Sequence, residues 1–346
     1  MRAYLPSALA LDRGHRCAAF GNARCGAAEP TYINDRSVII DVMSTSCPLA
    51  GRVALVAGAT RGCGRAIAVE LGALGVTVYG SGRTTRDARS EMDRPETIEG
   101  TAERVDAAGG TGIPVRCDHA DPADVAALTD RIRAEHGRLD VLVNDVWGGD
   151  PFTRWVKGVW EHPLEDTLRI VRNGIDTHLI TAHHALPLLI ETGEGLVVEV
   201  GDGKAGVPFR GVVAYDHVKE AVVRLGYSLA AELRPHGATA LSVTPGFLRS
   251  EAMLEHFGVT EATWRDASDA HGGYFRYSET PHLLGRGVAA LAADPERARF
   301  AGQCLGSWEL MHTYGFSDAV GERPDWGMVD AEARSADAEA AQPTAE

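Results

Sequence analysis

The tyrosine and lysine in the segment Tyr-Asp-His-Val-Lys, Tyr215 and Lys219, are the pair with the clearest catalytic potential. The segment 215–234 has helical apolar spacing, and residues four apart on a helix share one face. A phenol with a pKa of about 10 is a poor base at neutral pH, but a neighbouring ammonium lowers that pKa. Tyr215 could then give a proton to a carbonyl oxygen as hydride reaches the carbon, or take one in reverse. The pair predicts acid–base catalysis, with Tyr215 and Lys219 as catalytic residues.

A glycine-rich segment, residues 58–64 (Gly-Ala-Thr-Arg-Gly-Cys-Gly), has the features of a dinucleotide-binding loop. It follows the apolar run 53–57 and opens a helical stretch, and this context makes the signal specific. Gly58 permits a sharp exit from a strand, and Gly62 lets the backbone approach a pyrophosphate. Gly64 lets the helix pack closely, with its positive N-terminus facing the phosphates. The predicted contacts of this loop with the cofactor are Gly58, Thr60, Arg61, Gly62 and Gly64.

The end of the second apolar run, at residues 79–84, indicates whether NAD(H) or NADP(H) binds. An NAD site usually has Asp or Glu about 20 residues past the glycine loop, where it binds the ribose 2′-hydroxyl. Here residues 79–84 read Tyr-Gly-Ser-Gly-Arg-Thr, without an acid. Arg83 and Arg61 suit a 2′-phosphate instead, through paired charge-assisted hydrogen bonds. Either arginine alone could be an ordinary surface residue, but together at the two expected places they favour NADP(H).

Strand-like and helix-like patterns alternate along the chain, and they predict the elements that must position these residues. Strands are predicted from β-branched runs that end in Gly, Asn or Asp, at 53–58, 76–82, 113–118, 139–145, 196–202, 240–246 and 303–309. Helical spacing occupies 64–75, 122–136, 165–192 and 215–234, and Asp121-Pro122 and Thr280-Pro281 resemble helix starts. Strand alternating with helix predicts an α/β fold, a doubly wound parallel sheet of about seven strands with helices on both faces. Ligands of such sheets bind at the carboxyl ends of the strands, where every motif described above or below falls.

Four further segments follow the glycine loop in order, and together they resemble the short-chain dehydrogenase/reductase family. Cys117-Asp118 follows the third predicted strand, and residues 142–145 (Leu-Val-Asn-Asp) resemble the family's Asn-Asn-Ala-Gly turn after the fourth. Tyr215 and Lys219 match its Tyr-x-x-x-Lys signature. Residues 245–250 (Pro-Gly-Phe-Leu-Arg-Ser) resemble its Pro-Gly-x-x-x-Thr segment. The resemblance covers about residues 50–327.

The resemblance implies a Rossmann-type fold, NAD(P)(H) chemistry and specific cofactor contacts. Asp118 would contact the adenine, and Lys219 would hold the nicotinamide ribose. Further cofactor contacts are implied for Asn144, Pro245, Gly246 and Ser250. The resemblance also implies a homodimer or homotetramer built on the helices near 165–192 and 215–234.

Two positions depart from the family pattern. The family's catalytic serine follows the fifth strand, about thirteen residues before the tyrosine, and here Asp202 occupies that place. The family's assisting asparagine aligns with Gly174, while Asn173 sits one place earlier, about 100° round the helix. An ionised Asp202 about 4 Å from a developing alkoxide would cost about 4 kcal/mol at an effective dielectric of about 20. Loss of the serine donor would add about 3 kcal/mol.

Three hypotheses account for Asp202, which we predict to be the third catalytic residue. It could act protonated, as a hydrogen-bond donor. It could stabilise a cationic C=N substrate during hydride transfer. In the third hypothesis the chain is a non-redox cofactor-binding protein. The intact glycine loop and the Tyr215–Lys219 pair favour the first two. We therefore predict an NADP(H)-dependent oxidoreductase that transfers hydride to a ketone or aldehyde, or alternatively to an imine or iminium.

Two loops at carboxyl ends of strands, 147–164 and 247–280, are predicted to frame the substrate. Their candidate pocket residues are Trp147, Trp155, Phe247 and Phe257. These aromatic residues indicate a fairly large apolar substrate. For any one of them, simple packing of the loop is an equally good interpretation.

The composition limits the binding partners and the cellular location that can be expected. A formal net charge of −14 argues against nucleic acid or an anionic membrane as a partner. Six scattered cysteines show no metal-ligand spacing, so we predict no metal and a reducing, cytoplasmic location. No apolar run reaches the roughly 18 residues of a membrane helix. Residues 1–49 lack periodicity and are predicted to be a disordered extension, in which Met43 resembles an ordinary start. The Ala-rich, acidic residues 328–346 are predicted to be a disordered tail.

Overall fold

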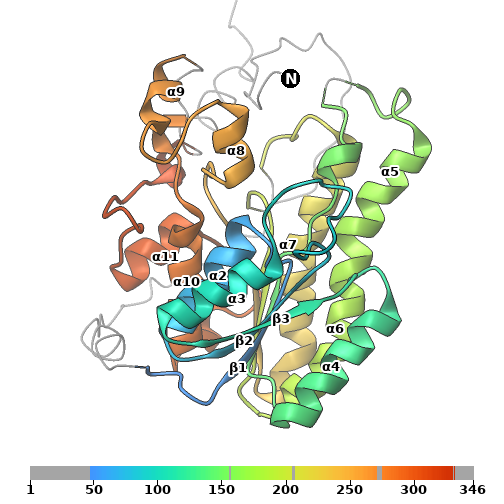
Figure 1. Cartoon of the computed structure of the whole chain (residues 1–346), viewed down its shortest axis with the longest axis vertical. Coiled ribbons are helices and arrows are strands. Elements are labelled where there is room, and N and C mark those ends of the chain that lie inside the picture. Colours follow the sequence, from blue (N-terminus) through green and yellow to red (C-terminus); the bar gives the residue numbers. More distant parts are fainter. Residues whose placement is uncertain (1–46, 156, 205–206, 271–274, 330, 332–346) are drawn as a thin grey trace, which may run out of the picture.

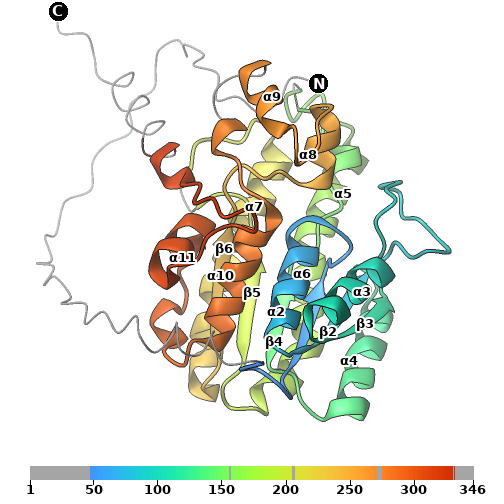
Figure 2. The same cartoon turned by 60° about the vertical axis from the view of Figure 1, so that its left-hand side comes forward.

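Seven parallel strands form one sheet in the order β3-β2-β1-β4-β5-β6-β7, with helices on both faces (Figure 1, Figure 2). The computed structural model describes residues 47–329 and 331, except 156, 205–206 and 271–274. The strands are β1 (Val53–Ala57), β2 (Thr77–Gly82), β3 (Thr111–Arg116), β4 (Val141–Asn144), β5 (Leu196–Val200), β6 (Thr239–Thr244) and β7 (Cys304–Gly306). The doubly wound parallel sheet predicted from the sequence is confirmed.

The helices form two layers because side chains of each strand alternate between the two faces of the sheet. In β1, Ala54 and Val56 belong to one core cluster, whereas Val53 and Leu55 belong to the other. The first cluster includes side chains of α2 (Gly62–Ala73), α3 (Ile98–Ala108), α10 (Pro281–Ala293) and α11 (Ser307–Tyr314). The second includes side chains of α4 (Pro122–His136), α6 (Thr177–Ile190) and α7 (Val213–Leu233). Both faces of the sheet are therefore buried.

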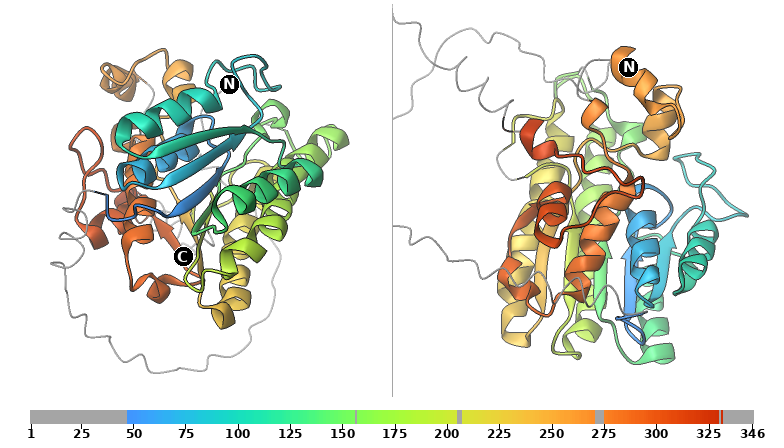
Figure 3. Two further views of the ribbon diagram at one scale, coloured as in Figure 1. Left: turned by 60° about the horizontal axis from the view of Figure 1, so that its bottom comes forward. Right: turned by 90° about the vertical axis from the view of Figure 1, so that its left-hand side faces the viewer.

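The carboxyl ends of the strands meet at one edge of the sheet. There Ala57 of β1 lies in register with Ser81 of β2 and Asn144 of β4, which brings the glycine loop beside the turns that follow those strands. Two short helices, α8 (Glu251–His256) and α9 (Trp264–Ala270), lie beyond this edge, as the right-hand view of Figure 3 shows in orange. The predicted substrate loop 247–280 contains both.

Several element boundaries differ from the sequence predictions. The stretch 165–192 comprises α5 (Leu164–Val171), a π-helical turn (Arg172–Asp176) and α6. The predicted strand 303–309 is wrong in its second half, because α11 begins at Ser307, where the Glu309 carboxylate accepts the Gly306 N–H at 2.8 Å. Helices α3, α8, α9 and α11 were not predicted.

The boundaries of the domain lie slightly outside the predicted range 50–327. Leu49 packs against the first core cluster, and its N–H donates to the Leu74 carbonyl at 2.9 Å. Val329 is also buried, with 3% exposure. These two residues therefore belong to the domain rather than to the predicted extension and tail. Most of both predicted segments, 1–46, 330 and 332–346, lies outside the described residues.

Within the described part of the chain, no helix is long and apolar enough to cross a membrane. The same residues contain no cluster of His, Cys, Asp and Glu side chains suited to a metal ion. The four cysteines among them, Cys47, Cys63, Cys117 and Cys304, are free thiols.

Candidate active site

The three predicted catalytic side chains meet at the carboxyl end of β5. Tyr215 lies in the first turn of α7, and its hydroxyl donates to Asp202 Oδ2 at 2.6 Å. Asp202 stands two residues past the end of β5. Lys219 lies one turn further along α7, with Nζ 5.4 Å from the centre of the Tyr215 ring. A carboxylate, a phenol and an ammonium are thus assembled at one place, and their catalytic role stays a prediction.

The charges around Asp202 are unbalanced. The buried Arg210 guanidinium binds Asp216 at 2.7 Å and Glu220 at 3.1 Å. Burial lowers the pKa of Arg210, but the hydrogen bond to Asp216 and the charges of Asp202 and Glu220 outweigh this effect and raise it. Three carboxylates therefore act on one guanidinium, and the Lys219 ammonium lies 5.4 Å from the centre of the Tyr215 ring.

Two tryptophans of the loop 147–164 lie against Tyr215. The Trp147 ring meets the Tyr215 ring edge-on at 5.3 Å, and the Trp155 ring lies 5.0 Å from it. Trp147 is held by a hydrogen bond from Nε1 to Asp150 at 2.6 Å, and Lys219 Nζ lies 4.3 Å from the centre of its ring. These two predicted pocket residues form an aromatic wall around the phenol.

Val218 and Trp147 together leave no room for a side chain at the place expected for the assisting asparagine. A Cβ atom on Gly174 would lie 2.4 Å from Val218 Cγ1 and 3.1 Å from the Trp147 ring, so a larger side chain does not fit there. Asn173 Nδ2 donates instead to the Gly148 carbonyl at 2.8 Å. The π-helical turn that carries both residues therefore supports the loop after β4.

The glycine loop divides into one open position and two tightly packed ones. Gly62 has φ +56°, and a Cβ atom there would meet nothing within 4 Å, so its backbone is open to an approaching group. A Cβ on Gly58 would lie 2.2 Å from the Asp145 carbonyl oxygen, and one on Gly64 would lie 2.4 Å from the Gly58 oxygen. Thr60 packs against the end of β2, where a Cβ on Gly82 would be 2.4 Å from its Oγ1. The loop fits a dinucleotide that approaches at Gly62.

Two carboxylates that were not among the predicted site residues bind the N-terminus of α2. The Gly62 N–H donates to Glu251 Oε2 at 3.0 Å, and Arg65 Nη1 pairs with Glu251 at 3.3 Å. The Gly64 N–H donates to Asp145. Removal of the Asp145 carboxylate from water raises its pKa to about 7, although the charge of Lys219 and the bond from Gly64 act in the opposite direction. Carboxylates favour a helix N-terminus for the same reason that phosphates do.

The two arginines predicted at the 2′-phosphate lie in different surroundings. Arg83 is ion-paired with Glu91 at 2.8 Å, and its Nη2 is 3.1 Å from the place that a Cβ on Gly148 would take. Arg61 is the partly exposed N-cap residue of α2 and makes no side-chain capping bond. A 2′-phosphate would share Arg83 with Glu91.

Two other predicted cofactor residues stabilise the turns in which they lie. Asp118 Oδ1 accepts the Ala120 N–H at 3.0 Å, and the Asp118 N–H donates to Asp124 at 3.0 Å. Ser250 is the N-cap of α8 and accepts the Met253 N–H at 3.4 Å. Both stand at the carboxyl edge where the cofactor is predicted to bind.

The side chain of Asn144 points into the interior of the sheet. Its Nδ2 donates to Glu199 at 2.8 Å, and Glu199 also lies 2.6 Å from Nδ1 of the buried His178. The other ring nitrogen of His178 is 3.1 Å from the Val146 carbonyl oxygen. This buried network fixes the turn after β4. In the sequence, this network is indicated only by Glu199, an acidic residue within the apolar strand 196–200.

A second buried acid, Glu279, supports the segment that begins with Pro245 and Gly246. It is fully buried, accepts from Ser307 Oγ at 2.7 Å and from the Gly246 N–H, and burial raises its pKa to about 8. Its backbone N–H donates to the Phe247 carbonyl at 2.9 Å. Glu279 therefore ties the end of β6 to the start of α11.

Phe247 and Phe257 lie in an aromatic cluster of the loop 247–280. Their rings are 6.5 Å apart, and those of Phe257 and Phe275 are 4.5 Å apart. Trp264 completes the cluster at 5.9 Å from Phe275. These contacts agree with the interpretation that the two phenylalanines pack the loop, and they leave their predicted contact with substrate untested.

Comparison with known proteins identifies the family. A model of the short chain dehydrogenase family matches residues 52–258. The human protein named dehydrogenase/reductase SDR family member 1 is 32% identical over 279 residues, which cover 80% of this chain and 86% of the human one. The Escherichia coli 3-oxoacyl-(acyl-carrier-protein) reductase is 28% identical over 74% of this chain and 95% of its own. The chain belongs to the short-chain dehydrogenase family, whose members are oxidoreductases that use NAD(P)(H).

Solved structures agree with the fold. A short chain dehydrogenase from Mycobacterium thermoresistibile has a TM-score of 0.66, 21% identity, and coverage of 80% of this chain and 92% of its own. A metagenomic short-chain oxidoreductase in complex with NADP has a TM-score of 0.56, 24% identity, and coverage of 72% and 93%. Both share the architecture described above.

Proposed function

We propose that this protein is an NADP(H)-dependent reductase of a ketone or aldehyde on a fairly large apolar substrate, with Tyr215 as the acid and base. The observation that carries the proposal is the hydrogen bond of Tyr215 to Asp202, one helical turn from Lys219, at the edge that holds the glycine loop. NADP(H) would supply or accept the hydride when bound. Arg61 and Arg83, with no acidic residue at the end of β2, support the phosphorylated cofactor.

In the reductive direction, Tyr215 gives its proton to the substrate oxygen while the carbon gains hydride. The ammonium of Lys219 favours the phenolate that remains. A protonated Asp202 takes the part of the family's serine and donates a hydrogen bond to the developing oxyanion, a role that needs a neutral acid. In the oxidative direction each proton moves back along the same path.

Reduction of an imine or iminium is a second candidate, which the charge balance favours. The three carboxylates of Asp202, Asp216 and Glu220 outnumber the two cations named beside them, Arg210 and Lys219, so an ionised Asp202 would stabilise a cationic C=N carbon. Hydride addition to an iminium gives a neutral amine without proton transfer to nitrogen. Trp147 and Trp155 add aromatic faces, which attract cations.

Replacement of Asp202 by Asn separates the two candidates. Asn keeps a hydrogen-bond donor, so we expect kcat for neutral ketones to remain nearly unchanged or to rise. Reduction of cyclic imines should fall by about 10²- to 10³-fold, because the stabilising charge is gone. Steady-state rates with NADPH measure both. A large loss on ketones together with no effect on imines would refute both roles of Asp202.

Turnover of a substrate panel tests the proposal as a whole. Oxidation of NADPH should accompany the reduction of some ketones, aldehydes or cyclic imines. Binding of NADPH without turnover of any of them would favour the alternative of a non-redox cofactor-binding protein.

We also propose that the pH dependence of cofactor affinity reports on Asp145. Its carboxylate shares the N-terminus of α2 with the expected pyrophosphate, and its pKa is raised to about 7. It is neutral below that pH, so we expect affinity for NADPH to be highest there and to fall about tenfold as pH rises to about 8.5. Fluorescence titration of NADPH binding at each pH measures this change in affinity.

Asp145→Asn should flatten the pH profile of NADPH affinity, and a profile unchanged by this substitution would contradict the assignment. NADH serves as the control, because it lacks the 2′-phosphate that titrates near pH 6.

Association into a dimer or tetramer is a further part of this proposal. The face formed by α5, α6 and α7 carries exposed apolar side chains, namely Leu164, Leu168, Leu179, Val213 and Tyr227. A second copy that covers this face would remove them from water.

A further inference from the structure

The two partners of the Tyr215–Asp202 hydrogen bond belong to different elements, so their distance depends on how these elements are placed against each other. Tyr215 lies in the first turn of α7, whereas Asp202 lies in the turn 201–204 that follows β5. The Gly203 N–H donates to Thr244 Oγ1 at 2.7 Å, and Thr244 is the last residue of β6. This bond fixes the turn relative to the sheet, but not relative to α7.

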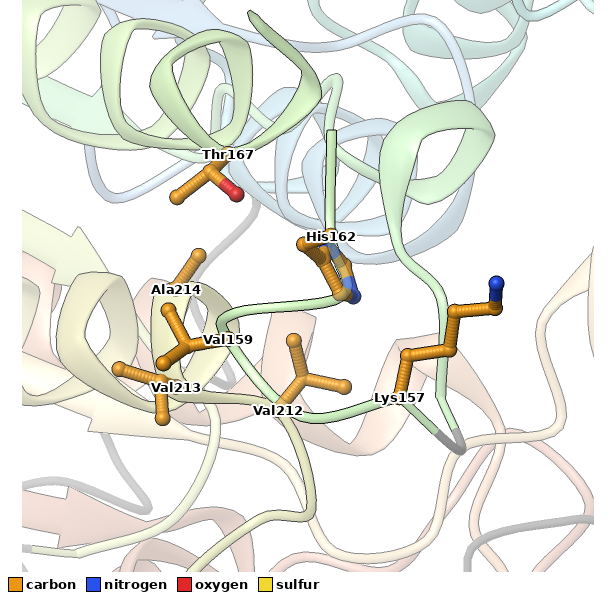
Figure 4. Close-up of a pocket in the computed structure, with 7 residues that line it drawn as sticks. All are labelled: Lys157, Val159, His162, Thr167, Val212, Val213 and Ala214. Atoms are coloured by element: carbon orange, nitrogen blue, oxygen red, sulfur yellow. The ribbon is translucent and has the colours of Figure 1, made fainter. Parts of the chain in front are cut away.

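The start of α7 is packed against the loop 147–164. Val212 and Ala214 line a narrow space together with Val159 and His162 of that loop (Figure 4), and the space has no room for a ligand. The Val212 and Ala214 side chains are buried, with 3% and 5% exposure. The first turn of α7 is therefore a fixed support, against which the turn 201–204 can be placed.

Arg210, in the segment that joins the turn 201–204 to α7, binds this helix through two carboxylates. Its side chain is buried, and its guanidinium donates to Asp216 Oδ1 at 2.7 Å and to Glu220 Oε1 at 3.1 Å. Its backbone N–H also donates to Asp216, at 3.3 Å. Asp216 and Glu220 stand four residues apart and share one face of α7. A planar guanidinium can bind both carboxylates at once, so Arg210 is fixed to this face.

The same guanidinium lies beside the turn that carries Asp202. A Cβ atom on Gly203 would be 3.0 Å from Arg210 Nη2, so the guanidinium lies against the backbone directly after Asp202. Gly203 has φ +82°, a conformation that favours glycine, and no side chain separates its backbone from Arg210. The charge of Asp202 is also one of those that act on Arg210. Arg210 therefore joins the turn that carries Asp202 to the helix that carries Tyr215.

The two carboxylates that bind Arg210 and the predicted catalytic pair occupy neighbouring faces of α7. Asp216 and Glu220 each follow a member of that pair, Tyr215 and Lys219, by one position, which is about 100° round the helix. The guanidinium is thus bound to a face next to the one that carries the phenol. It can support the turn 201–204 without itself reaching the reacting atoms.

We propose that Arg210 is a positioning residue, which holds the turn 201–204 against α7 and thereby places the Asp202 carboxyl at the Tyr215 hydroxyl. The inference rests on the proposed reductase function. It applies to both candidate roles of Asp202, because a hydrogen bond to an oxyanion and the stabilisation of an iminium both weaken as the carboxyl moves away. A displacement of about 1 Å can lower the rate by about 10²-fold.

Replacement of Arg210 by Lys, in the natural protein and in Asp202→Ala, tests this role. Lysine keeps the positive charge but lacks the planar fork that binds two carboxylates. We expect Arg210→Lys to lower kcat by about 10- to 10²-fold, while KM and the affinity for NADPH change by less than about threefold. In Asp202→Ala the same substitution should lower kcat by less than about twofold further, because no carboxyl remains to be placed. Rates are measured with NADPH and the substrate panel, including acetophenone as a neutral ketone and 2-methyl-1-pyrroline as a cyclic imine.

Asp216→Asn weakens the attachment of Arg210 from the side of α7, and it replaces Arg210→Lys if that variant does not fold. Asp216 is partly exposed, so the fold is expected to persist. We expect kcat to fall by about 3- to 10-fold, and this loss should again be absent when Asp202 is alanine. Fluorescence titration with NADPH checks that the cofactor site is intact in each variant.

Arg52 provides the matched control, because it also binds two carboxylates, those of Asp140 and Glu194. These three residues lie just before β1, β4 and β5, at the amino ends of the strands and so at the opposite edge of the sheet. Arg52→Met should leave kcat within about twofold of its starting value, both in the natural protein and in Asp202→Ala.

The outcomes separate a positioning role from a general structural one. Equal losses of kcat from Arg210→Lys with and without the Asp202 carboxyl would overturn the proposal. An unchanged kcat in Arg210→Lys, or the same pattern of losses in Arg52→Met, would overturn it as well. If no compound of the panel is turned over, the reductase function fails and this inference fails with it, whereas additive losses overturn the inference alone.

Discussion

Replacement of Tyr215 by Phe should lower kcat by about 10³-fold while the affinity for NADPH changes by less than about threefold. The substitution removes only the hydroxyl that donates to Asp202, and general acid catalysis by one group typically contributes 10²- to 10⁴-fold. The phenyl ring can still pack against Trp147 and Trp155, so the fold is expected to persist. Steady-state NADPH oxidation and fluorescence titration measure the two quantities.

Tyr227 provides the matched control for this experiment. It lies on the same helix, α7, and is 52% exposed. Tyr227→Phe should leave kcat within about twofold of the natural protein. If Tyr215→Phe retained turnover, a different group would have to supply the proton, and the proposed mechanism would be wrong.

Replacement of Arg249 by Met should lower the free energy of unfolding by about 3–5 kcal/mol. The Arg249 guanidinium is fully buried, binds Glu261 at 2.8 Å and the Ser278 carbonyl, and lies 4.1 Å from the centre of the Trp264 ring. The buried Asp318 carboxylate lies 3.9 Å away. Removal of one partner from a buried ion pair leaves uncompensated charge, which is the costly case. Urea denaturation measures the loss.

Arg265 is the control for Arg249, because it also lies over the Trp264 ring, at 4.5 Å, and also pairs with a glutamate, Glu322. Its side chain is 66% exposed, so we expect Arg265→Met to cost less than about 1 kcal/mol. Equal and small losses in both variants would show that burial of Arg249 contributes little. A loss confined to Arg249 would show that its buried guanidinium stabilises the packing of the loop 247–280.

The fold was predictable from sequence because its signals are local. Each strand is a short apolar run, and β1 at Val53–Ala57 falls within the predicted range 53–58. Asp121 caps α4 as predicted, accepting the Ala123 N–H at 2.9 Å. Where local signals are weak the prediction failed. After β7 the chain turns into α11 at Ser307, although the sequence there reads as a continuing strand.

The candidate site was predictable only in part. Family motifs brought Tyr215, Lys219 and Asp202 together in advance of the structure. Contacts between distant segments were not predictable, since the glutamate on the Gly62 N–H comes from a residue 189 positions further along the chain. The same applies to Gly174, where the Val218 side chain of α7 and the Trp147 indole leave no space for a larger residue. Such contacts depend on the packing of loops at the edge of the sheet, which no local pattern encodes.

The carboxylate of Glu251 on the Gly62 N–H bears on the order in which ligands can bind. A phosphate oxygen bonded to that N–H would take the place of the carboxylate, because one N–H does not serve two anions. Binding of the dinucleotide would then displace the Glu251 carboxylate from the Gly62 N–H in one step. Since Glu251 is the first residue of α8, this exchange would remove one contact between α2 and the predicted substrate loop, while Arg65 and Arg94 keep their ion pairs with α8. If that contact restricts the loop, the dinucleotide is expected to bind before the substrate.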